Sequence, residues 1–114
     1  MNCEKNLLRF IGLCRGAGKA VLGTDMVCEY LRKRSGKKSK NRNEIDVLVL
    51  EASDTSENTH KKISDKCIYY NVKHIRLSAT CEILGEAVGK TNVAAIAITD
   101  ANFCRAIIEK TERA

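Results

Sequence analysis

Residues 81–100 read CEILGEAVGKTNVAAIAITD, and this stretch decides the fold class. Apolar side chains recur in its first half at helical spacing, at Ile83, Leu84, Ala87 and Val88. They predict a short amphipathic helix over Thr80–Val88, and Gly89 follows where a left-handed residue would end it. The wholly apolar run Val93–Ile98 has the length of a strand, and such runs are typical of strands buried on both faces.

Helices and apolar strands alternate through the rest of the chain. Strands are predicted at Lys19–Leu22, Ile45–Leu50, His74–Leu77 and Val93–Thr99. Helices are predicted at residues 4–15, from Thr24 onward, from a capping box of Asp54 and Glu57 through Tyr70, over Thr80–Val88, and from Asp100 through Ile108. This order predicts an α/β fold in which helices cover both faces of one central sheet. A length of 114 residues predicts a single domain, residues 1–114.

The composition indicates an ordinary soluble protein, with 44% apolar and 30% charged residues. No apolar run approaches the roughly 20 residues of a membrane span. The first ten residues lack the layout of a secretory signal, because Arg9 interrupts a short apolar stretch. We therefore expect a cytoplasmic protein that does not contact a membrane.

The net charge of +6 comes from one segment. Residues 32–44 (RKRSGKKSKNRNE) carry seven basic side chains and one acidic one, whereas the rest of the chain carries 13 of each kind. The segment has no apolar residue and no regular period, which predicts a loop. Two interpretations stay open: a loop that only aids solubility, or an arm whose lysines, Lys37 and Lys38 among them, attract phosphates by releasing counterions.

Six cysteines are scattered along the chain without a C-x-x-C pair. Most lie among apolar neighbours, where a free thiol behaves as a small hydrophobic side chain, so we expect buried, reduced thiols. A zinc site from Cys67 and His74 is the alternative, but structural zinc usually takes its ligands in closely spaced pairs. We expect neither a metal nor a cofactor.

Four motifs carry a resemblance over most of the chain. They are LGEAVG at 84–89 followed four residues later by Ala94-Ala95, IGLCRGAGK at 11–19, VLVLEASDTSEN at 47–58 and CIYYNV at 67–72. Together they resemble the bacterial branch of the ribosomal protein L-seven-Ae / L-thirty-e family, whose members bind RNA, chiefly kink-turns. The resemblance implies a three-layer α-β-α sandwich with a mixed four-stranded sheet and about five helices.

The resemblance also implies two RNA-contacting regions. The first is a glycine turn and the start of the second helix, written G-[TS]-N-E-x-x-K in the family, and it falls on Gly23, Thr24, Asp25 and Met26. The second is the loop before the last strand, made of Gly89, Lys90, Thr91, Asn92, Val93 and Ala94. A helix start offers free N–H groups to RNA, and an apolar loop residue can stack on an unpaired base.

Individual residues of this set have alternative interpretations. Lys90 is expected to reach a phosphate, and Val93 to cover an extruded base unless it is the first buried residue of the strand. Arg15 and Lys19 flank the glycine turn Gly16-Ala17-Gly18. They are expected on the same face as the RNA-contacting regions, or at a solvated helix end. Met26 is interpreted as a residue of the core or its rim in preference to an RNA contact.

The chain departs from the family pattern in the first region. Asp25 takes the asparagine position, Met26 the glutamate position and Glu29 the lysine position. An ionised aspartate only accepts hydrogen bonds, and a glutamate repels a phosphate backbone. We predict a monomeric, non-catalytic RNA-binding protein of the ribosome, or associated with it in translation, that recognises kinked or irregular RNA. The alternative is a module that docks on ribosomal or ribosome-assembly proteins and binds RNA only weakly.

An enzymatic function is not predicted. Residues 12–19 superficially resemble a P-loop, but five residues separate Gly12 from Gly18, and Ala20 follows the lysine where Ser or Thr is required. Neither His60 nor His74 stands in a recognisable catalytic pattern, so both are expected to be surface or structural residues.

Overall fold

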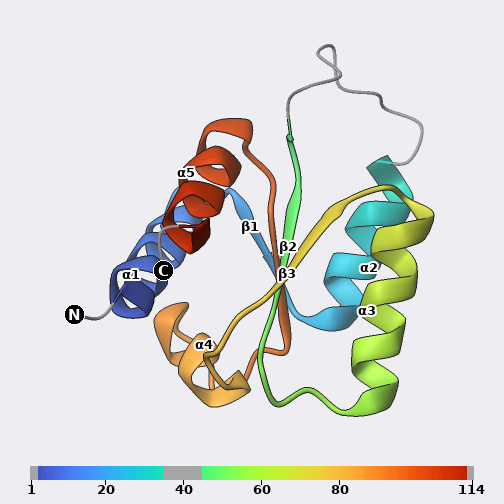
Figure 1. Cartoon of the computed structure of the whole chain (residues 1–114), viewed down its shortest axis with the longest axis horizontal. Helices are drawn as coiled ribbons and strands as arrows, with labels where there is room; N and C mark the ends of the chain where they lie inside the picture. The colour runs from blue at the N-terminus through green and yellow to red at the C-terminus, as the bar shows by residue number, and fades with distance from the viewer. Residues whose placement is uncertain (1–2, 35–44, 113–114) are drawn as a thin grey trace.

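The computed structural model describes residues 3–34 and 45–112, which form five helices and four strands (Figure 1). In chain order the elements are α1 (Cys3–Gly16), β1 (Ala20–Leu22), α2 (Thr24–Arg34), β2 (Leu48–Glu51), α3 (Glu57–Tyr69), β3 (Lys73–Arg76), α4 (Cys81–Ala87), β4 (Ala95–Ile98) and α5 (Ala101–Glu112). The predicted alternation of helix and strand is confirmed.

The four strands form one mixed sheet in the order β1-β4-β2-β3. Strand β4 runs antiparallel to both β1 and β2, whereas β2 and β3 are parallel. Every residue of the two middle strands, β2 and β4, is buried. The apolar run that ends at Ile98 is therefore confirmed as a strand covered on both faces.

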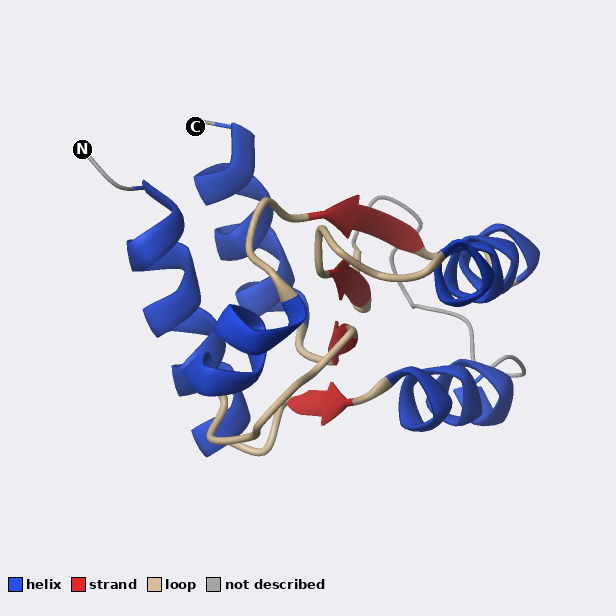
Figure 2. Ribbon diagram, turned by 90° about the horizontal axis from the view of Figure 1, so that it is seen from below, coloured by secondary structure: helices blue, strands red, loops and turns tan. Residues whose placement is uncertain are grey.

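Helices cover the two faces of the sheet unequally (Figure 2). Side chains alternate along β2 and β4, so Leu48, Leu50, Ile96 and Ile98 point to one face and pack with α1, α4 and α5. On the other face, Val49, Ala95 and Ala97 pack with α2 and α3. The three-layer α-β-α sandwich is confirmed.

One end of the sheet collects the starts of three helices. Strands β1, β2 and β3 all finish there, because Leu22 pairs with Ile96, and Glu51 pairs with both Ala95 and Arg76. Helices α2, α3 and α4 follow these strands in turn, and β4 enters the sheet at the same end. This region, bounded by Leu22, Glu51, Arg76 and Ala95, is called the helix-start end below.

The predicted caps need one correction. Asp54 does not cap α3; the N-cap is Ser56, whose hydroxyl oxygen accepts from the backbone N–H of Thr59 at 3.2 Å. The Asp54 carboxylate instead accepts from the backbone N–H of Cys81 at 2.7 Å and so binds the first turn of α4. The cap of α5 by Asp100 is confirmed, because its carboxylate accepts from the N–H groups two and three residues later.

The basic segment also begins differently from the prediction. Helix α2 continues through Arg34, so residues 32–34 are helical and not part of a loop. The Arg34 guanidinium makes two hydrogen bonds of 2.9 Å to the carboxylate of Asp46. Eleven helical residues span about 16 Å, so Arg34 lies well away from the helix-start end. Lys37 and Lys38 lie outside the described residues.

Candidate nucleic-acid interface

The turn at Gly23 is fixed against the middle of the sheet. Its φ of +94° favours glycine. The Gly23 N–H donates to the carbonyl of Ala95 at 2.8 Å, and its own carbonyl accepts from Val27 in the first turn of α2 at 2.9 Å. Met26 is 60% exposed on that turn, which excludes a place in the core and leaves a position at its rim or an RNA contact.

The loop from Gly89 to Asn92 is anchored to α4 and exposes its side chains. Gly89 has the predicted left-handed backbone, with a φ of +76°. The N–H of Lys90 donates to the carbonyl of Gly85 at 2.8 Å. A Cβ added at Gly85 would lie 2.9 Å from the backbone of Asn92, so only glycine lets the loop pack this closely. Lys90 is thereby held at the surface by a rigid backbone.

The two regions implied by the family resemblance meet at the helix-start end. The Gly23 turn donates to Ala95, the first residue of β4. Ala94, which precedes Ala95, accepts through its carbonyl from the N–H of Ala52, in the loop after β2, at 2.9 Å. The start of β4 therefore holds the Gly23 turn, the Gly89–Asn92 loop and the loop of residues 52–56 together.

Val93 is buried instead of exposed. It is 4% exposed and belongs to the core that packs against α1, α4 and α5. The prediction that Val93 covers a base is therefore wrong, and the alternative, a buried residue leading into the strand, is confirmed. Ala94 is partly buried, whereas Gly89, Lys90, Thr91 and Asn92 are exposed.

Arg15 and Lys19 do not share this surface. The carbonyl of Lys19 accepts from the N–H of Thr99, which follows β4, so Lys19 lies where β4 leaves the sheet. Lys19 and Gly23 are four positions apart along extended chain, a distance of about 13 Å at 3.3 Å per residue. Both side chains are exposed, but at the end of the sheet opposite the helix-start end.

The acidic residues that break the family pattern are paired with basic ones. The Nζ of Lys62 in α3 lies 2.9 Å from the carboxylate of Asp25. The Glu29 carboxylate lies 2.8 Å from Arg32 and 3.6 Å from Lys33. The hydrogen bond from Arg32 lowers the pKa of Glu29, and the hydrogen bond to Asp25 raises the pKa of Lys62. Neither acid therefore presents an uncompensated negative charge.

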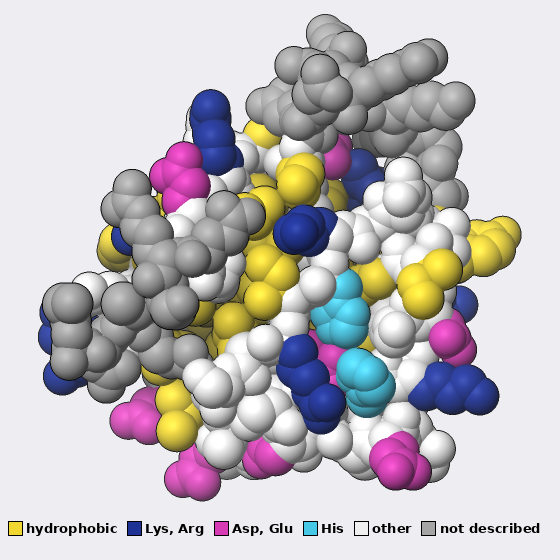
Figure 3. All heavy atoms as spheres, in the orientation of Figure 1, with side chains coloured by type: hydrophobic (Ala, Val, Ile, Leu, Met, Phe, Trp, Pro, Cys, Tyr) yellow, Lys and Arg dark blue, Asp and Glu magenta, His cyan; other side chains and the backbone are white. Residues whose placement is uncertain are grey.

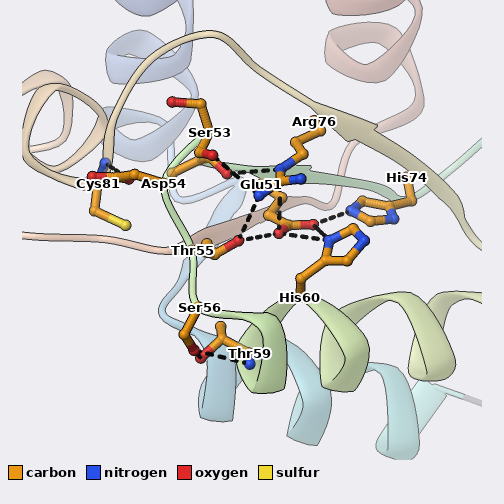
Figure 4. A network of polar contacts seen from close by, with 11 residues as sticks. Glu51, Ser53, Asp54, Thr55, Ser56, Thr59, His60, His74, Arg76 and Cys81 are labelled. Atoms are coloured by element: carbon orange, nitrogen blue, oxygen red, sulfur yellow. Dashed lines mark hydrogen bonds and ion pairs between the residues drawn. The ribbon is translucent and has the colours of Figure 1, made fainter.

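A buried carboxylate, absent from the sequence-based set, lies at the helix-start end (Figure 4). Glu51 is 0% exposed. Its oxygens accept from the Thr55 hydroxyl, from Nδ1 of His60 at 2.9 Å and from Nε2 of His74 at 2.7 Å. The Nε of Arg76 lies 3.7 Å away. These five residues are called the Glu51 cluster.

The Glu51 cluster keeps its carboxylate charged. Burial raises the pKa of Glu51, but the hydrogen bonds from Thr55, His60 and His74 together outweigh it and hold the pKa below the ordinary value. The two histidines are thus structural, as expected from the sequence, but no local sequence pattern shows that both bind Glu51. The one available signal was strand alternation, which points Glu51 the same way as the core residue Val49.

The described thiols are unsuited to nucleophilic chemistry. Cys14, Cys67 and Cys104 are buried and free. Burial raises the pKa of Cys67 and of Cys104 to about 12, so neither forms a thiolate near neutral pH. Within residues 3–34 and 45–112, no group of three His, Cys, Asp or Glu side chains is arranged to hold a metal ion. None of the helices described is long and apolar enough to cross a membrane.

Comparison with known proteins identifies the family. The RNA-binding protein YlxQ of Bacillus subtilis (strain 168) is 35% identical over 98 residues, which cover 86% of this chain and 87% of that protein. This chain belongs to the YlxQ family. The RNA-binding protein YlxQ of Enterococcus faecium is 32% identical over 87 residues, which cover 76% of this chain and 74% of that protein. No family model matches the chain.

The fold of this YlxQ-family chain recurs in a solved structure. A protein with unknown function from Bacillus halodurans C superposes with a TM-score of 0.76, over 93% of this chain and 96% of that chain, at 25% sequence identity. The likeness extends over nearly the whole of both chains and so includes the helix-start end.

Proposed function

We propose that this protein binds structured RNA, without catalysis, at the helix-start end of its sheet. The observation that carries the proposal is the gathering of three helix starts, those of α2, α3 and α4, beside the exposed Gly89–Asn92 loop. The N-terminal end of a helix is the positive end of the helix dipole, which suits phosphates. Lys90 adds a full positive charge to the same end.

The names of the relatives support RNA as the ligand, because both YlxQ proteins are described as RNA-binding. The pairing of Asp25 with Lys62 and of Glu29 with Arg32 removes the main electrostatic objection to RNA at the start of α2. The hydrogen bonds that join the Gly23 turn, residues 52–56 and the Gly89–Asn92 loop make a preformed surface, which favours a ligand of defined shape over flexible single strands.

The finer proposal is a kinked or irregular RNA, such as a kink-turn of ribosomal RNA, bound by a ribosomal or ribosome-associated protein. It rests on the family resemblance of the sequence motifs. The contact with an extruded base must then come from a residue other than the buried Val93. Met26, 60% exposed in the first turn of α2, is the apolar side chain best placed for it.

The test is a titration of the protein against a kink-turn RNA and a straight duplex of matched length, each at two salt concentrations. The expected result is tighter binding of the kink-turn, with an affinity that falls as salt rises. Weak, equal binding of both RNAs would agree with the proposal of RNA binding but contradict recognition of the kink-turn. Absence of binding to both would contradict the proposed function and favour the alternative, docking on ribosome-assembly proteins.

A further inference from the structure

The Glu51 cluster leaves one imidazole nitrogen at the surface. An ionised carboxylate can only accept hydrogen bonds, so each histidine must donate from the nitrogen that faces Glu51. His60 donates from Nδ1, which leaves Nε2 as the ring nitrogen that is not bonded to Glu51. The His60 side chain is 42% exposed and that of His74 only 18%, so His60 presents its second nitrogen to solvent.

The cluster lies within the proposed RNA surface. Glu51 ends β2 and Arg76 ends β3, and His60 stands in the first turn of α3. Arg76 is 44% exposed, and its guanidinium donates to the carbonyl of Ser53 at 3.1 Å. Figure 3 shows both histidine side chains on the molecular surface with basic side chains beside them.

The charge of the cluster depends on pH in one direction. With neutral histidines, the negative charge of Glu51 cancels the positive charge of Arg76, and each proton added to a histidine contributes one positive charge. The other titratable groups near Glu51 are Cys67 on α3 and Cys81 on α4, and the Asp54 carboxylate is bonded to the backbone of Cys81. Both thiols stay neutral, because burial raises the pKa of Cys67 to about 12 and that of Cys81 to about 11.

We propose that His60 is a protonation-dependent contact for an RNA phosphate. The buried Glu51 carboxylate holds its ring in position, and the neighbouring Arg76 adds a second positive charge. The inference rests on the proposed RNA-binding function and assigns a residue to it. Protonated His60 donates from Nδ1 to Glu51 and from Nε2 to a phosphate oxygen. Neutral His60 keeps the first hydrogen bond and loses the second. Because Glu51 fixes the ring in both states, the change acts on RNA affinity and not on the fold.

The experiment compares RNA affinity at about pH 8 and about pH 6, the interval in which histidine changes charge. The wild-type protein should bind about tenfold more tightly at the lower pH, the worth of one charge-assisted hydrogen bond. Its plot of log affinity against log salt concentration should also steepen by about 0.7–0.9, the contribution of one phosphate contact. The steeper slope separates a phosphate contact from a change in folding.

Two variants complete the test, with thermal melting at both pH values to establish that each is folded. His60→Asn keeps an amide donor at the position of Nδ1 for Glu51 but cannot take up a proton, so its affinity and salt slope should not change with pH. His74→Gln removes the less exposed histidine and should keep the wild-type response. A pH response that survives in His60→Asn, or its absence from the wild type, would overturn this inference but not the proposed RNA binding. If the folded wild-type protein binds no RNA at either pH, both the inference and the proposed function fail.

Discussion

The ammonium group of Lys62 lies 2.9 Å from the carboxylate of Asp25, so helix α3 supplies a positive charge to the first turn of α2. Lys62→Ala should therefore expose the negative charge of Asp25 to bound RNA. We expect RNA affinity to fall about two- to fivefold at low salt, in line with exposed ion pairs. The measurement is a dissociation constant for the same RNA at one fixed salt concentration.

Two further variants isolate the pair. Lys61→Ala removes an equal charge from the neighbouring position but leaves Asp25 paired, so it should weaken binding less. Asp25→Asn combined with Lys62→Ala should recover most of the loss. Equal weakening by Lys61→Ala and Lys62→Ala would mean that only the overall charge of α3 matters.

The close contact at Gly85 leads to a prediction on stability. A methyl group there would lie 2.9 Å from the backbone of Asn92 and 3.0 Å from the carbonyl of Lys90. Gly85→Ala should lower the free energy of unfolding by about 1–3 kcal/mol, as overpacking does, although alanine normally favours a helix. Urea unfolding measures the change.

Gly16 provides the matched control, because a Cβ added to this residue at the end of α1 meets no atom within 4 Å. Gly16→Ala should leave stability unchanged or raise it by up to about 1 kcal/mol. If both alanine variants stabilise the protein, the Gly89–Asn92 loop is not packed as tightly as described.

Reversal of charge at Lys90 tests the position of the RNA surface. Lys90→Glu should weaken RNA binding by about tenfold or more at low salt and reduce the magnitude of the salt slope by about one. Lys19→Glu makes the same change of charge at the opposite end of the sheet and should weaken binding much less. A larger effect at Lys19 than at Lys90 would contradict the proposal, because it would place the RNA at the opposite end of the sheet.

The lowered pKa of Glu51 predicts how stability depends on pH. A carboxylate whose pKa is lower in the folded state stabilises the fold fully above its unfolded pKa of about 4.3, and this contribution is lost as pH falls through the lower value. The wild-type unfolding free energy should therefore fall between about pH 5 and pH 3. Glu51→Gln should be about 1–3 kcal/mol less stable near neutral pH, because an amide cannot accept all the bonds of the carboxylate.

The difference between the two pH profiles isolates this one group from the other acids. Glu51→Gln should show a flatter profile than the wild type below about pH 5. Glu57→Gln, an exposed neighbour at the start of α3, should follow the wild-type profile. Parallel profiles for wild type and Glu51→Gln would mean that Glu51 does not carry the acid-sensitive part of the stability.

Local periodicity was enough to predict the order of elements. The apolar run before Thr99, the left-handed Gly89 and the cap at Asp100 each depend on residues within a few positions of one another, and all three are present. The cap of α3 was misassigned because four consecutive residues, 53–56, can all cap a helix. The true role of Asp54 depends on Cys81, which lies 27 positions away.

The candidate site was only partly predictable for the same reason. The Gly23 turn and the Gly89–Asn92 loop are named from motifs that lie far apart in the sequence, and the structure brings them together through Ala94 and Ala95. Lys19 is close to Gly23 in sequence, but a strand of three residues carries the chain across the sheet between them. The two histidine partners of Glu51 lie 9 and 23 positions away, beyond any local pattern.

The central place of β4 in the sheet has a consequence for biosynthesis. Strand β1 pairs with β4, and β2 is connected to β1 only through β4, although β4 is synthesised last of the four described strands. Until residues 95–98 leave the ribosome, the Gly23 turn lacks its acceptor, Ala95, and the two early strands have no common neighbour. A nascent chain therefore cannot assemble the proposed RNA surface piece by piece, and the surface forms only after residues 95–98 have emerged and the sheet closes.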